Sequence, residues 1–356
     1  GTLPAADGTY SLTAQVIDAA GNTSAPSAPF DITLDRGLPT TPATAPDMTA
    51  GTDSGVNNDD TTKDTTPDFA IPAPGVGETP SLYVDGAKVP ATFDPLTNTL
   101  TPTSPLSEGP HSISYTLTDA AGNESARSPD LPVTIDTTAP AAPAAPDMTT
   151  ATDSGTNTGD DSTNDTTPDF TVAVPVGHTA TLYVDGIAVP ASLVAGVLTP
   201  TNPLPGGAHS ISYTVTDPSG NESAQSSALP ISIDTAAPGT PTITAAPENA
   251  GGGINTAEAS SNNSAGQPGT DLIVSIPADA QVGDVLTLKL GSAVGAPTVA
   301  YTVQAGDIGG SATVPVPKTT LDLLADGTIA VTATLTDAAG NTSAPSAPFD
   351  ITLDRG

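Results

Sequence analysis

Apolar and polar residues alternate along several stretches of this chain. In residues 111–118, Ile, Tyr and Leu take every second position and polar or small residues stand between them, and residues 327–336 follow the same period. A period of two predicts half-buried strands in antiparallel sheets. The one candidate for a helix, residues 319–325, is short and bounded by proline and glycine. The pattern therefore predicts an all-β protein.

Internal repeats set the length of the folding unit. Residues 18–37 recur unchanged as residues 337–356. Shorter repeats lie one module apart, with LYVDG starting at 82 and 182 and HSISYT starting at 111 and 209. The endings VTID, ISID and ITLD close successive units, in which the final residues are Asp35, Asp136, Asp234 and Asp354. We expect a segment of a larger array, divided into a partial module and three complete ones at 1–35, 36–136, 137–234 and 235–356.

Short strands joined by Pro, Gly, Asn and Asp turns, in units of about 100 residues, are typical of immunoglobulin-like sandwiches. We therefore expect tandem immunoglobulin-like β-sandwich domains in an extended array. The chain has no cysteine and no tryptophan, and only 3% of its residues are aromatic. Thin cores follow from this composition, and a domain of this size is only marginally stable. Something besides hydrophobic burial is expected to stabilise the modules.

The charge balance narrows the possible partners. Seven Lys and Arg residues stand against 39 Asp and Glu residues, a formal net charge of −32. Such a chain cannot neutralise the phosphates of nucleic acid, and it is repelled by anionic membrane surfaces. No apolar run approaches the length of about 20 residues that crosses a bilayer, so we expect no membrane insertion. Three histidines and no cysteine also leave little room for a zinc or iron site.

The carboxylates gather in two corresponding loops. One loop belongs to the first module and the other to the second, and together they contain Asp53, Asp59, Asp60, Asp64, Asp153, Asp160, Asp161 and Asp165. Carboxylates this close in sequence repel one another, and a hard divalent cation with six to eight oxygen ligands removes the repulsion. The loops predict bound calcium. A single acidic loop would more simply be a solvated surface, but the recurrence favours a cation.

The expected topology brings further carboxylates to the same places. In such a sandwich the acidic loop faces the next module, whereas the loop before the last strand faces the previous one. The acidic loops should therefore approach the linker residues, and the motif Thr-Asp-x-x-Gly-Asn should arrive from the following module. The candidate ligands added by this argument are Asp35, Asp119, Asp136, Asp217, Asp234 and Asp337. Calcium at these junctions would hold consecutive modules at a fixed angle.

The third module differs from the first two. Its early segment is rich in glycine and poor in acids, and its candidate oxygen ligands are Glu248, Asn255 and Glu258. An unliganded, flexible loop is an equally good interpretation of this segment.

The combination of Asp-x-x-Gly-Asn-x-Ser, Ile-Asp-Thr-x-Ala-Pro and an Asp-rich loop ending in Asp-x-Thr-Pro-Asp-Phe resembles the bacterial Ig-like repeats of giant type I-secreted adhesins and biofilm-associated proteins. The resemblance covers nearly the whole chain. It implies an extended, calcium-rigidified stalk at the bacterial cell surface, with a separate adhesive domain that binds a surface or host receptor. Calcium and the neighbouring modules would be the partners of this segment itself.

Three other functions compete with a stalk. An enzyme is disfavoured because the carboxylates lie in repeated loops, and no catalytic triad or phosphate-binding loop is present. A calcium-dependent carbohydrate or receptor-binding module remains open, above all for the third module. A self-assembling extracellular filament also remains open, because residues 1–35 supply only the last strands of a sandwich.

Overall fold

The computed structural model describes residues 6–155, 157–251 and 253–356. By their contacts these residues form two compact units. The first contains Gly1–Ala141 with two loops of the second module, Pro175–Thr179 and Val215–Ala224. The second contains the rest of the second module and all of the third. Each of the two module junctions discussed below therefore lies inside one unit.

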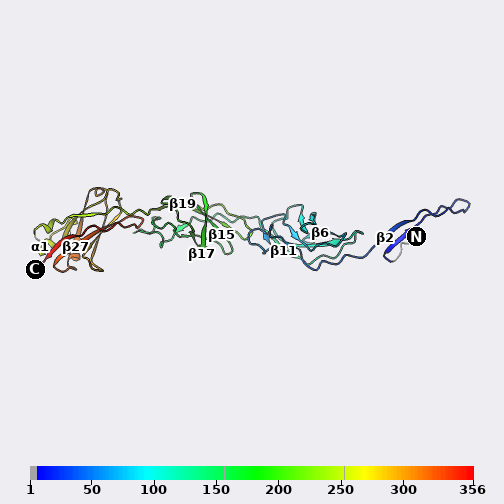
Figure 1. Ribbon diagram of the computed structural model, residues 1–356, viewed down its shortest axis with the longest axis horizontal. Coiled ribbons are helices and arrows are strands. Elements are labelled where there is room, and N and C mark those ends of the chain that lie inside the picture. Colours follow the sequence, from blue (N-terminus) through cyan, green and yellow to red (C-terminus); the bar gives the residue numbers. More distant parts are fainter. Residues whose placement is uncertain (1–5, 156, 252) are drawn as a thin grey trace. The chain divides into compact units, whose positions relative to one another are not determined.

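The first module is a sandwich of two sheets (Figure 1). One has the order β3-β5-β9-β8 and the other the order β4-β11-β10-β6-β7. The strands are β3 (Asp47–Met48), β4 (Thr61–Thr62), β5 (Phe69–Ala70), β6 (Thr79–Val84), β7 (Ala87–Lys88), β8 (Ala91–Asp94), β9 (Thr99–Pro102), β10 (Gly109–Thr118) and β11 (Leu131–Ile135). All pairs are antiparallel except β4 with β11, which places the end of the acidic loop beside the strand that leads into the linker.

The second module repeats this arrangement, with sheets β12-β14-β18-β17 and β13-β20-β19-β15-β16. Its strands are β12 (Asp147–Met148), β13 (Ser162–Thr163), β14 (Phe170–Thr171), β15 (Thr179–Val184), β16 (Ile187–Val189), β17 (Ala191–Val194), β18 (Val197–Pro200), β19 (Gly207–Thr216) and β20 (Leu229–Ile233). The repeated LYVDG motif forms the end of β6 and of β15. Its Asp and Gly then make a tight hairpin with positive φ at both residues.

The third module has a three-stranded sheet, β21-β23-β26, and a five-stranded sheet, β22-β28-β27-β24-β25. Its elements are β21 (Thr242–Ala245), a 3-10 turn (Pro247–Gly251), β22 (Ile254–Asn255), α1 (Thr256–Ala259), β23 (Gly269–Ser275), β24 (Val285–Leu290), β25 (Thr298–Thr302), β26 (Ser311–Pro317), α2 (Lys318–Leu321), β27 (Gly327–Thr336) and β28 (Phe349–Asp354). The short helix candidate at 319–325 is a single helical turn that begins one residue earlier, at Lys318. The Gly-rich segment adds a second one-turn helix that the sequence did not predict.

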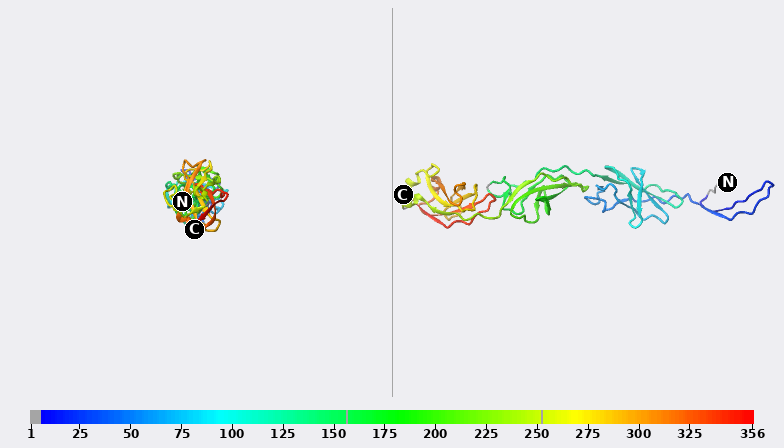
Figure 2. Two further views of the ribbon diagram at one scale, coloured as in Figure 1. Left: turned by 90° about the vertical axis from the view of Figure 1, so that its left-hand side faces the viewer. Right: turned by 90° about the horizontal axis from the view of Figure 1, so that it is seen from above.

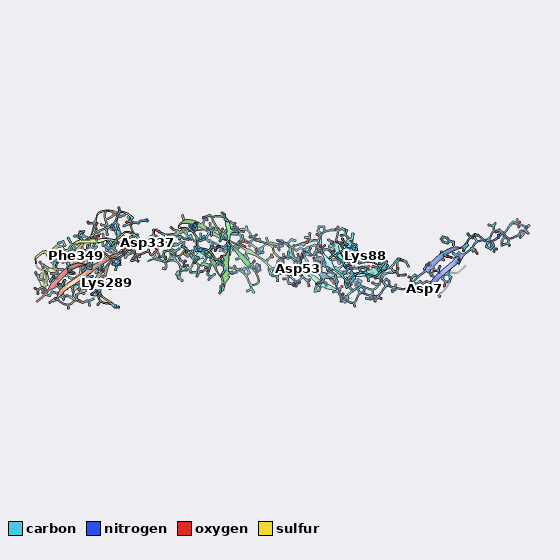
Figure 3. All side chains as sticks on the ribbon, in the orientation of Figure 1. Asp7, Asp53, Lys88, Lys289, Asp337 and Phe349 are labelled. Atoms are coloured by element: carbon cyan, nitrogen blue, oxygen red, sulfur yellow. The ribbon has the colours of Figure 1, made fainter. Side chains whose placement is uncertain are left out.

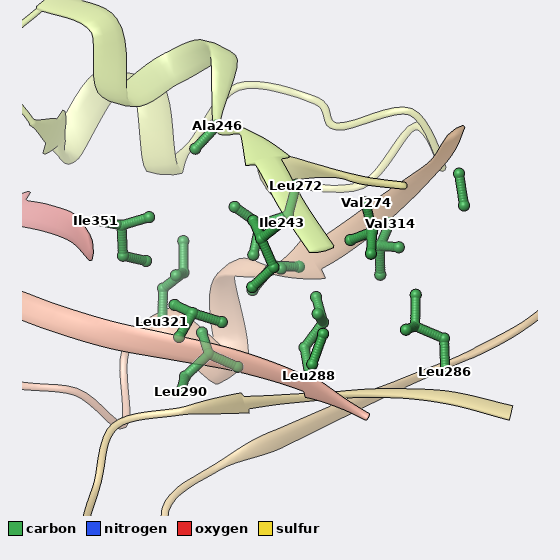
Figure 4. Close-up of a cluster of buried hydrophobic side chains, with 14 of the residues drawn as sticks. Ile243, Ala246, Leu272, Val274, Leu286, Leu288, Leu290, Val314, Leu321 and Ile351 are labelled. Atoms are coloured by element: carbon green, nitrogen blue, oxygen red, sulfur yellow. The ribbon is translucent and has the colours of Figure 1, made fainter. Parts of the chain in front are cut away.

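The cores lie between the paired sheets. In the first module Phe69 and Leu100 from one sheet meet Leu82 and Ile113 from the other, and all four are essentially inaccessible to solvent. The third module is better filled than the composition suggests, since residues from both of its sheets and from α2 join one cluster that includes Leu272, Leu288 and Leu321 (Figure 4). The prediction of thin cores therefore does not hold for the third module.

The period-two pattern of residues 111–118 is only partly reproduced in space. Ile113 and Tyr115 are buried as expected, but Ser114 and Thr116 on the opposite face are buried too. Side chains from the neighbouring strand β6 and from the loop after β10 lie on that face. Glu124 accepts hydrogen bonds there from the hydroxyls of Thr116, at 2.5 Å, and of Tyr83, at 3.0 Å. The hydroxyl of Thr116 is thus buried with a partner, whereas the hydroxyl of Ser114 is buried without a hydrogen-bond partner among the described residues, and the alternation alone predicts neither.

The N-terminal residues form a two-stranded hairpin, β1 (Gly8–Leu12) with β2 (Phe30–Leu34), drawn in blue in Figures 1 and 2. This hairpin has the same sequence over residues 18–37 as the end of the third module. Its apolar side chains are nevertheless open to solvent, with Phe30 69% exposed and Leu12 49% exposed.

Candidate functional site

Each acidic loop begins with a buried aspartate. Asp53 is 3% exposed and Asp153 is 2% exposed, whereas aspartate is almost never fully buried without a partner. One carboxylate oxygen of Asp53 accepts a hydrogen bond from the amide of Asn58 at 2.5 Å. The other oxygen, Oδ1, is inaccessible and has no hydrogen-bond partner among the described residues, and the same holds for Oδ1 of Asp153. The position of Asp53 is shown in Figure 3.

The neighbouring aspartates add to this unfavourable electrostatic environment. Asp60 and Asp161 take equivalent positions with left-handed backbone, at φ of 56° and 57°. Burial raises the pKa of Asp60, and the charge of Asp53 raises it further. Burial likewise raises the pKa of Asp161, with a contribution from Asp153. The loops therefore hold carboxylates where their charged forms are disfavoured, in the absence of a cation.

The other acids of the loops are used locally. The carboxylates of Asp59 and Asp160 accept hydrogen bonds from amides two residues further on, at 3.0 and 3.1 Å. Asp64 and Asp165 do the same at 2.8 Å each. These are Asx turns, in which the side chain stabilises the loop backbone. Among the described residues, no group of three or more Asp, Glu, His or Cys side chains is already arranged to hold a metal ion.

The backbone carbonyls of the linker aspartates accept hydrogen bonds from a loop of the following module. Asn221 donates through Nδ2 to the carbonyl of Asp136 at 2.8 Å, and Asn341 donates in the same way to Asp234 at 2.8 Å. A longer bond of 3.2 Å joins Asn123 to Asp35. The expected loop thus reaches the linker.

The aspartates of the same motif have an internal role. The carboxylates of Asp119, Asp217 and Asp337 each accept hydrogen bonds from both the backbone and the side chain of the Asn four residues later. They hold that Asn in position. Sequence reasoning missed the Asn itself, although its constant place in the repeated motif was a signal.

A second set of contacts locks the acidic loop to the next module. Ser54 donates to the carbonyl of Ser219 at 2.6 Å, and Ser154 donates to the carbonyl of Ala339. The glycine that follows each serine lies against the same loop. A Cβ added to Gly155 would overlap the carbonyl oxygen of Ala338.

Gly55 is in the same position at the other junction, where an added Cβ would overlap the carbonyl oxygen of Pro218. Both glycines have positive φ, at 78° for Gly55 and 96° for Gly155. The junctions are close-packed interlocks in which only glycine fits.

The candidate ligands of the third module have other partners. Asn255 is the N-cap of α1 and accepts from the amides of Ala257 and Glu258, while Glu258 accepts from the amide of Asn255. This reciprocal capping box accounts for both side chains without a metal. Glu248 accepts a hydrogen bond of 2.7 Å from the hydroxyl of Thr270.

Two histidines form a repeated ion pair. Nδ1 of His111 lies 2.8 Å from Asp85, and Nδ1 of His209 lies 2.8 Å from Asp185. Nε2 of His209 faces the carbonyl of Pro205 at 2.9 Å. Because both ring nitrogens face acceptors, the doubly protonated form is favoured. The hydrogen bond to Asp185 raises the pKa of His209, against the opposing effect of burial.

Comparison with known proteins identifies the family. Residues 40–137 and 139–235 each match the family described as bacterial Ig-like domain, and together they cover more than half of the chain. The chain belongs to this bacterial Ig-like domain family. Residues 1–32 match a second family of the same description. No curated protein sequence matches the chain. No helix in the described part is both long and apolar enough to span a membrane.

Several solved structures resemble this bacterial Ig-like chain. Fibronectin(III)-like modules of Clostridium thermocellum CbhA are 12% identical over 49% of this chain and 87% of that chain, with a TM-score of 0.33. A Ca2+-stabilised adhesin of an Antarctic bacterium is 20% identical over 97% of this chain and 82% of that chain, with a TM-score of 0.31. A titin I-band fragment is 10% identical over 83% and 94%, with a TM-score of 0.29. Likeness at this level concerns the fold alone.

Proposed function

We propose that this chain is a structural stalk segment of a bacterial cell-surface adhesin, working outside the cell, with calcium rigidifying its module junctions. The family supports a repeat region built of Ig-like domains. The observation that carries the proposal is the repeated interlock. The same asparagine-to-linker and serine-to-loop hydrogen bonds occur at two junctions.

The interlock suits a load-bearing role because it couples modules that are joined in series. A flexible string of domains needs only a linker, and most contacts between domains in one chain are small and polar. Here the chain reserves glycine at Gly55 and Gly155, where any side chain would prevent the loops from meeting. Glycine at these two positions therefore allows the backbones of the two loops to pack in direct contact.

The buried oxygens support calcium as the second element. Oδ1 of Asp53 and of Asp153 is desolvated without a hydrogen bond, and leaving a charged oxygen in this state is costly. Calcium accepts carboxylate and carbonyl oxygens in variable geometry, and neighbouring Asp60 and Asp161 supply further carboxylates. The donor set therefore fits calcium. When bound, the ion would offset the charge of the loop that forms one half of each junction.

A paired measurement tests the proposal. The 356-residue chain is melted and its small-angle scattering recorded in EDTA and in about 1 mM calcium, the range in which extracellular modules bind. We expect calcium to raise the melting temperature and to stiffen the chain, and we expect magnesium at the same concentration to do less.

The double variant Asp53→Asn and Asp153→Asn is expected to lose most of this response. The conservative change Asp350→Asn, at an exposed site away from the loops, serves as the matched control. Unchanged melting and scattering on calcium addition would refute the calcium-rigidified stalk.

A further inference from the structure

The five-stranded sheet of the third module has a groove on the face that points away from the core. Its volume is about 430 Å³, and it is bounded by Pro345 and Pro348, from the segment between β27 and β28. Five hydroxyls and one ammonium make up its polar lining, from Thr287, Ser292, Thr298, Thr332, Thr334 and Lys289. The position of Lys289 is marked in Figure 3. The volume is within the range of small-molecule sites, about 300–1,000 Å³.

The groove continues along the sheet. A second hollow, also of about 430 Å³, shares Gly291, Ser292 and Ala330 with it and extends to Leu323. The side chain of Leu323 is 73% exposed. An elongated ligand can therefore lie across both hollows.

In the first module the same face of the sheet is filled by the module's own side chains. Tyr83 and Thr116 donate hydrogen bonds to Glu124, at 3.0 and 2.5 Å. Lys88 forms an ion pair with Glu124 at 3.4 Å, and the guanidinium of Arg127 lies 5.8 Å from the centre of the Tyr83 ring. These side chains partner one another and leave no charged group of this cluster unpaired.

The third module has other residues at three of these positions. In the first module the amide of Tyr115 donates to the hydroxyl of Ser128 at 3.1 Å. In the third module the amide of Ala333 donates to the hydroxyl of Ser346 at 3.0 Å, so the two pairs are equivalent. Counted from these pairs, and from the register of the neighbouring strand, the exchanges are Tyr83 to Lys289, Glu124 to Thr342 and Arg127 to Pro345. The filling cluster is thereby lost, and the groove occupies its place.

The groove contains a cation without a counter-charge. The chain has seven Lys and Arg residues against 39 Asp and Glu residues. Within the described ranges, six of the seven make an ion pair, a hydrogen bond or a ring contact, namely Arg36, Lys63, Lys88, Arg127, Lys318 and Arg355. Lys289 makes none of these with any described residue, and its cross-strand neighbours are Thr298 and Thr332. An unpaired ammonium in so acidic a chain favours an anionic ligand, since complementary charges determine which partners a surface accepts.

The floor of the groove offers hydroxyls rather than free main-chain groups. β24 and β27 are interior strands, so their backbone groups bond to neighbouring strands, whereas an extended peptide binds a sheet by adding a strand at its edge. Threonine hydroxyls both donate and accept, as sugar hydroxyls do. The threonine methyls and the rings of Pro345 and Pro348 add apolar surface that suits the C–H face of a sugar ring. A ligand that combines hydroxyls with a carboxylate matches all of these features.

We propose that the groove binds an acidic saccharide, a chain of sugar units that carry carboxylates, by pairing one carboxylate with Lys289 and sugar hydroxyls with Thr332 and Thr334. The site needs no metal ion, because the ammonium supplies the positive charge. It gives the third module a binding role that goes beyond the stalk and does not depend on calcium at the junctions.

Isothermal titration of trigalacturonate into the 356-residue chain tests the proposal. The titration is done in EDTA, because calcium would bridge uronate and protein carboxylates and create binding elsewhere. We expect trigalacturonate to bind and the uncharged galactose trisaccharide to bind about tenfold more weakly or not at all. The affinity for trigalacturonate should fall between about 0.05 and 0.3 M salt, since a partly exposed ion pair is screened.

Variants assign the binding to the groove. Lys289→Gln should weaken trigalacturonate binding about fivefold, the loss of one partly exposed ion pair, and Lys289→Arg should retain most of it. Lys88→Gln makes the same change of charge in the first module and should leave the affinity unchanged. Thr332→Val, which removes a hydroxyl at nearly constant shape, should weaken binding by a similar factor. Far-UV circular dichroism establishes that each variant is folded, and the exposed face makes all of these changes compatible with the core.

Two results would overturn the proposal. One is no binding of trigalacturonate, or equal binding to the wild-type chain and Lys289→Gln. The other is a hexaglutamate peptide that binds as tightly as trigalacturonate with the same dependence on Lys289, which would assign the groove to an acidic peptide instead.

Discussion

The interlock at the second junction can be tested by adding one methyl group. Gly155→Ala places a Cβ on a residue with φ of 96°, a conformation that costs an L-residue about 1–2 kcal/mol. The new carbon would overlap the carbonyl oxygen of Ala338 and lie 3.0 Å from its carbonyl carbon. The docked loop must therefore move away, since both sides of the contact are backbone.

The loss of junction stability can be estimated from the hydrogen bonds that this movement breaks. The hydrogen bond from Ser154 to Ala339 and the bond from Asn341 to Asp234 each contribute about 1 kcal/mol. Together with the backbone cost, the junction is expected to weaken by about 3 kcal/mol. Opening of the loop would then become about a hundredfold more frequent.

Hydrogen exchange measured by mass spectrometry is the direct assay. Peptides covering residues 337–341 should exchange faster in Gly155→Ala, while peptides from β23 and β26, which lie in the core of the third module, should be unaffected. Gly159→Ala is the matched control in the same acidic loop, because its nearest neighbour to an added Cβ is 3.9 Å away and its φ is not positive. Equal exchange in Gly155→Ala and Gly159→Ala would refute the close-packed interlock.

Three further predictions concern single side chains. Without calcium, Asp153→Asn should raise the melting temperature, because it removes a buried carboxylate whose pKa is raised by burial. With calcium, the same substitution should lower the melting temperature. A change of the same sign in both buffers would contradict this prediction. Arg355→Lys should destabilise the third module by about 1–3 kcal/mol in urea unfolding, since Arg355 donates to the carbonyls of Leu321 and Leu324. The matched control is Arg36→Lys, in the identical sequence of the exposed hairpin, which should change stability little. Because the pKa of His209 is raised in the folded state, protonation of this residue stabilises the fold fully below about pH 6.5, and the stabilisation is lost as the pH rises through the folded-state pKa. The urea midpoint of the wild-type chain should therefore fall relative to that of His209→Gln between about pH 6 and pH 8.5. Parallel profiles of the two chains would exclude this linkage.

The fold was largely predictable because its signals are local and repeated. Alternation, turn residues and repeat spacing all depend on neighbours in sequence, and they indicate sandwiches. Residues 18–37 and 337–356 show where that reasoning stops. Ile351 is inaccessible in the third module, whereas the equivalent Ile32 of the N-terminal hairpin is only half-buried; likewise Phe349 is half-buried, whereas the equivalent Phe30 is 69% exposed. Burial depends on which strands are present to pair with, and no local pattern contains that information.

The candidate site was predicted in outline only. Acidic loops, linkers and following loops were expected at the junctions, since sandwich topology fixes which loops share a pole. The residues that make the contacts were not foreseen, because Gly55 and Asn221 are ordinary turn residues until a second module lies against them. Asp59 and Asp64 were selected as candidate ligands, and their carboxylates also stabilise their own loop. An acidic residue in a loop can have both uses, and the sequence pattern does not separate them.

The junctions also show how near-identical modules acquire different chemistry. The backbone interlock is the same in both. Lys63 and Asn164 occupy the same place in that geometry, and the exchange of an ammonium for an amide alters only the charge balance of the pole. A tandem array can in this way change the charge of each junction separately by a substitution at one loop position, without altering the sandwich that carries it.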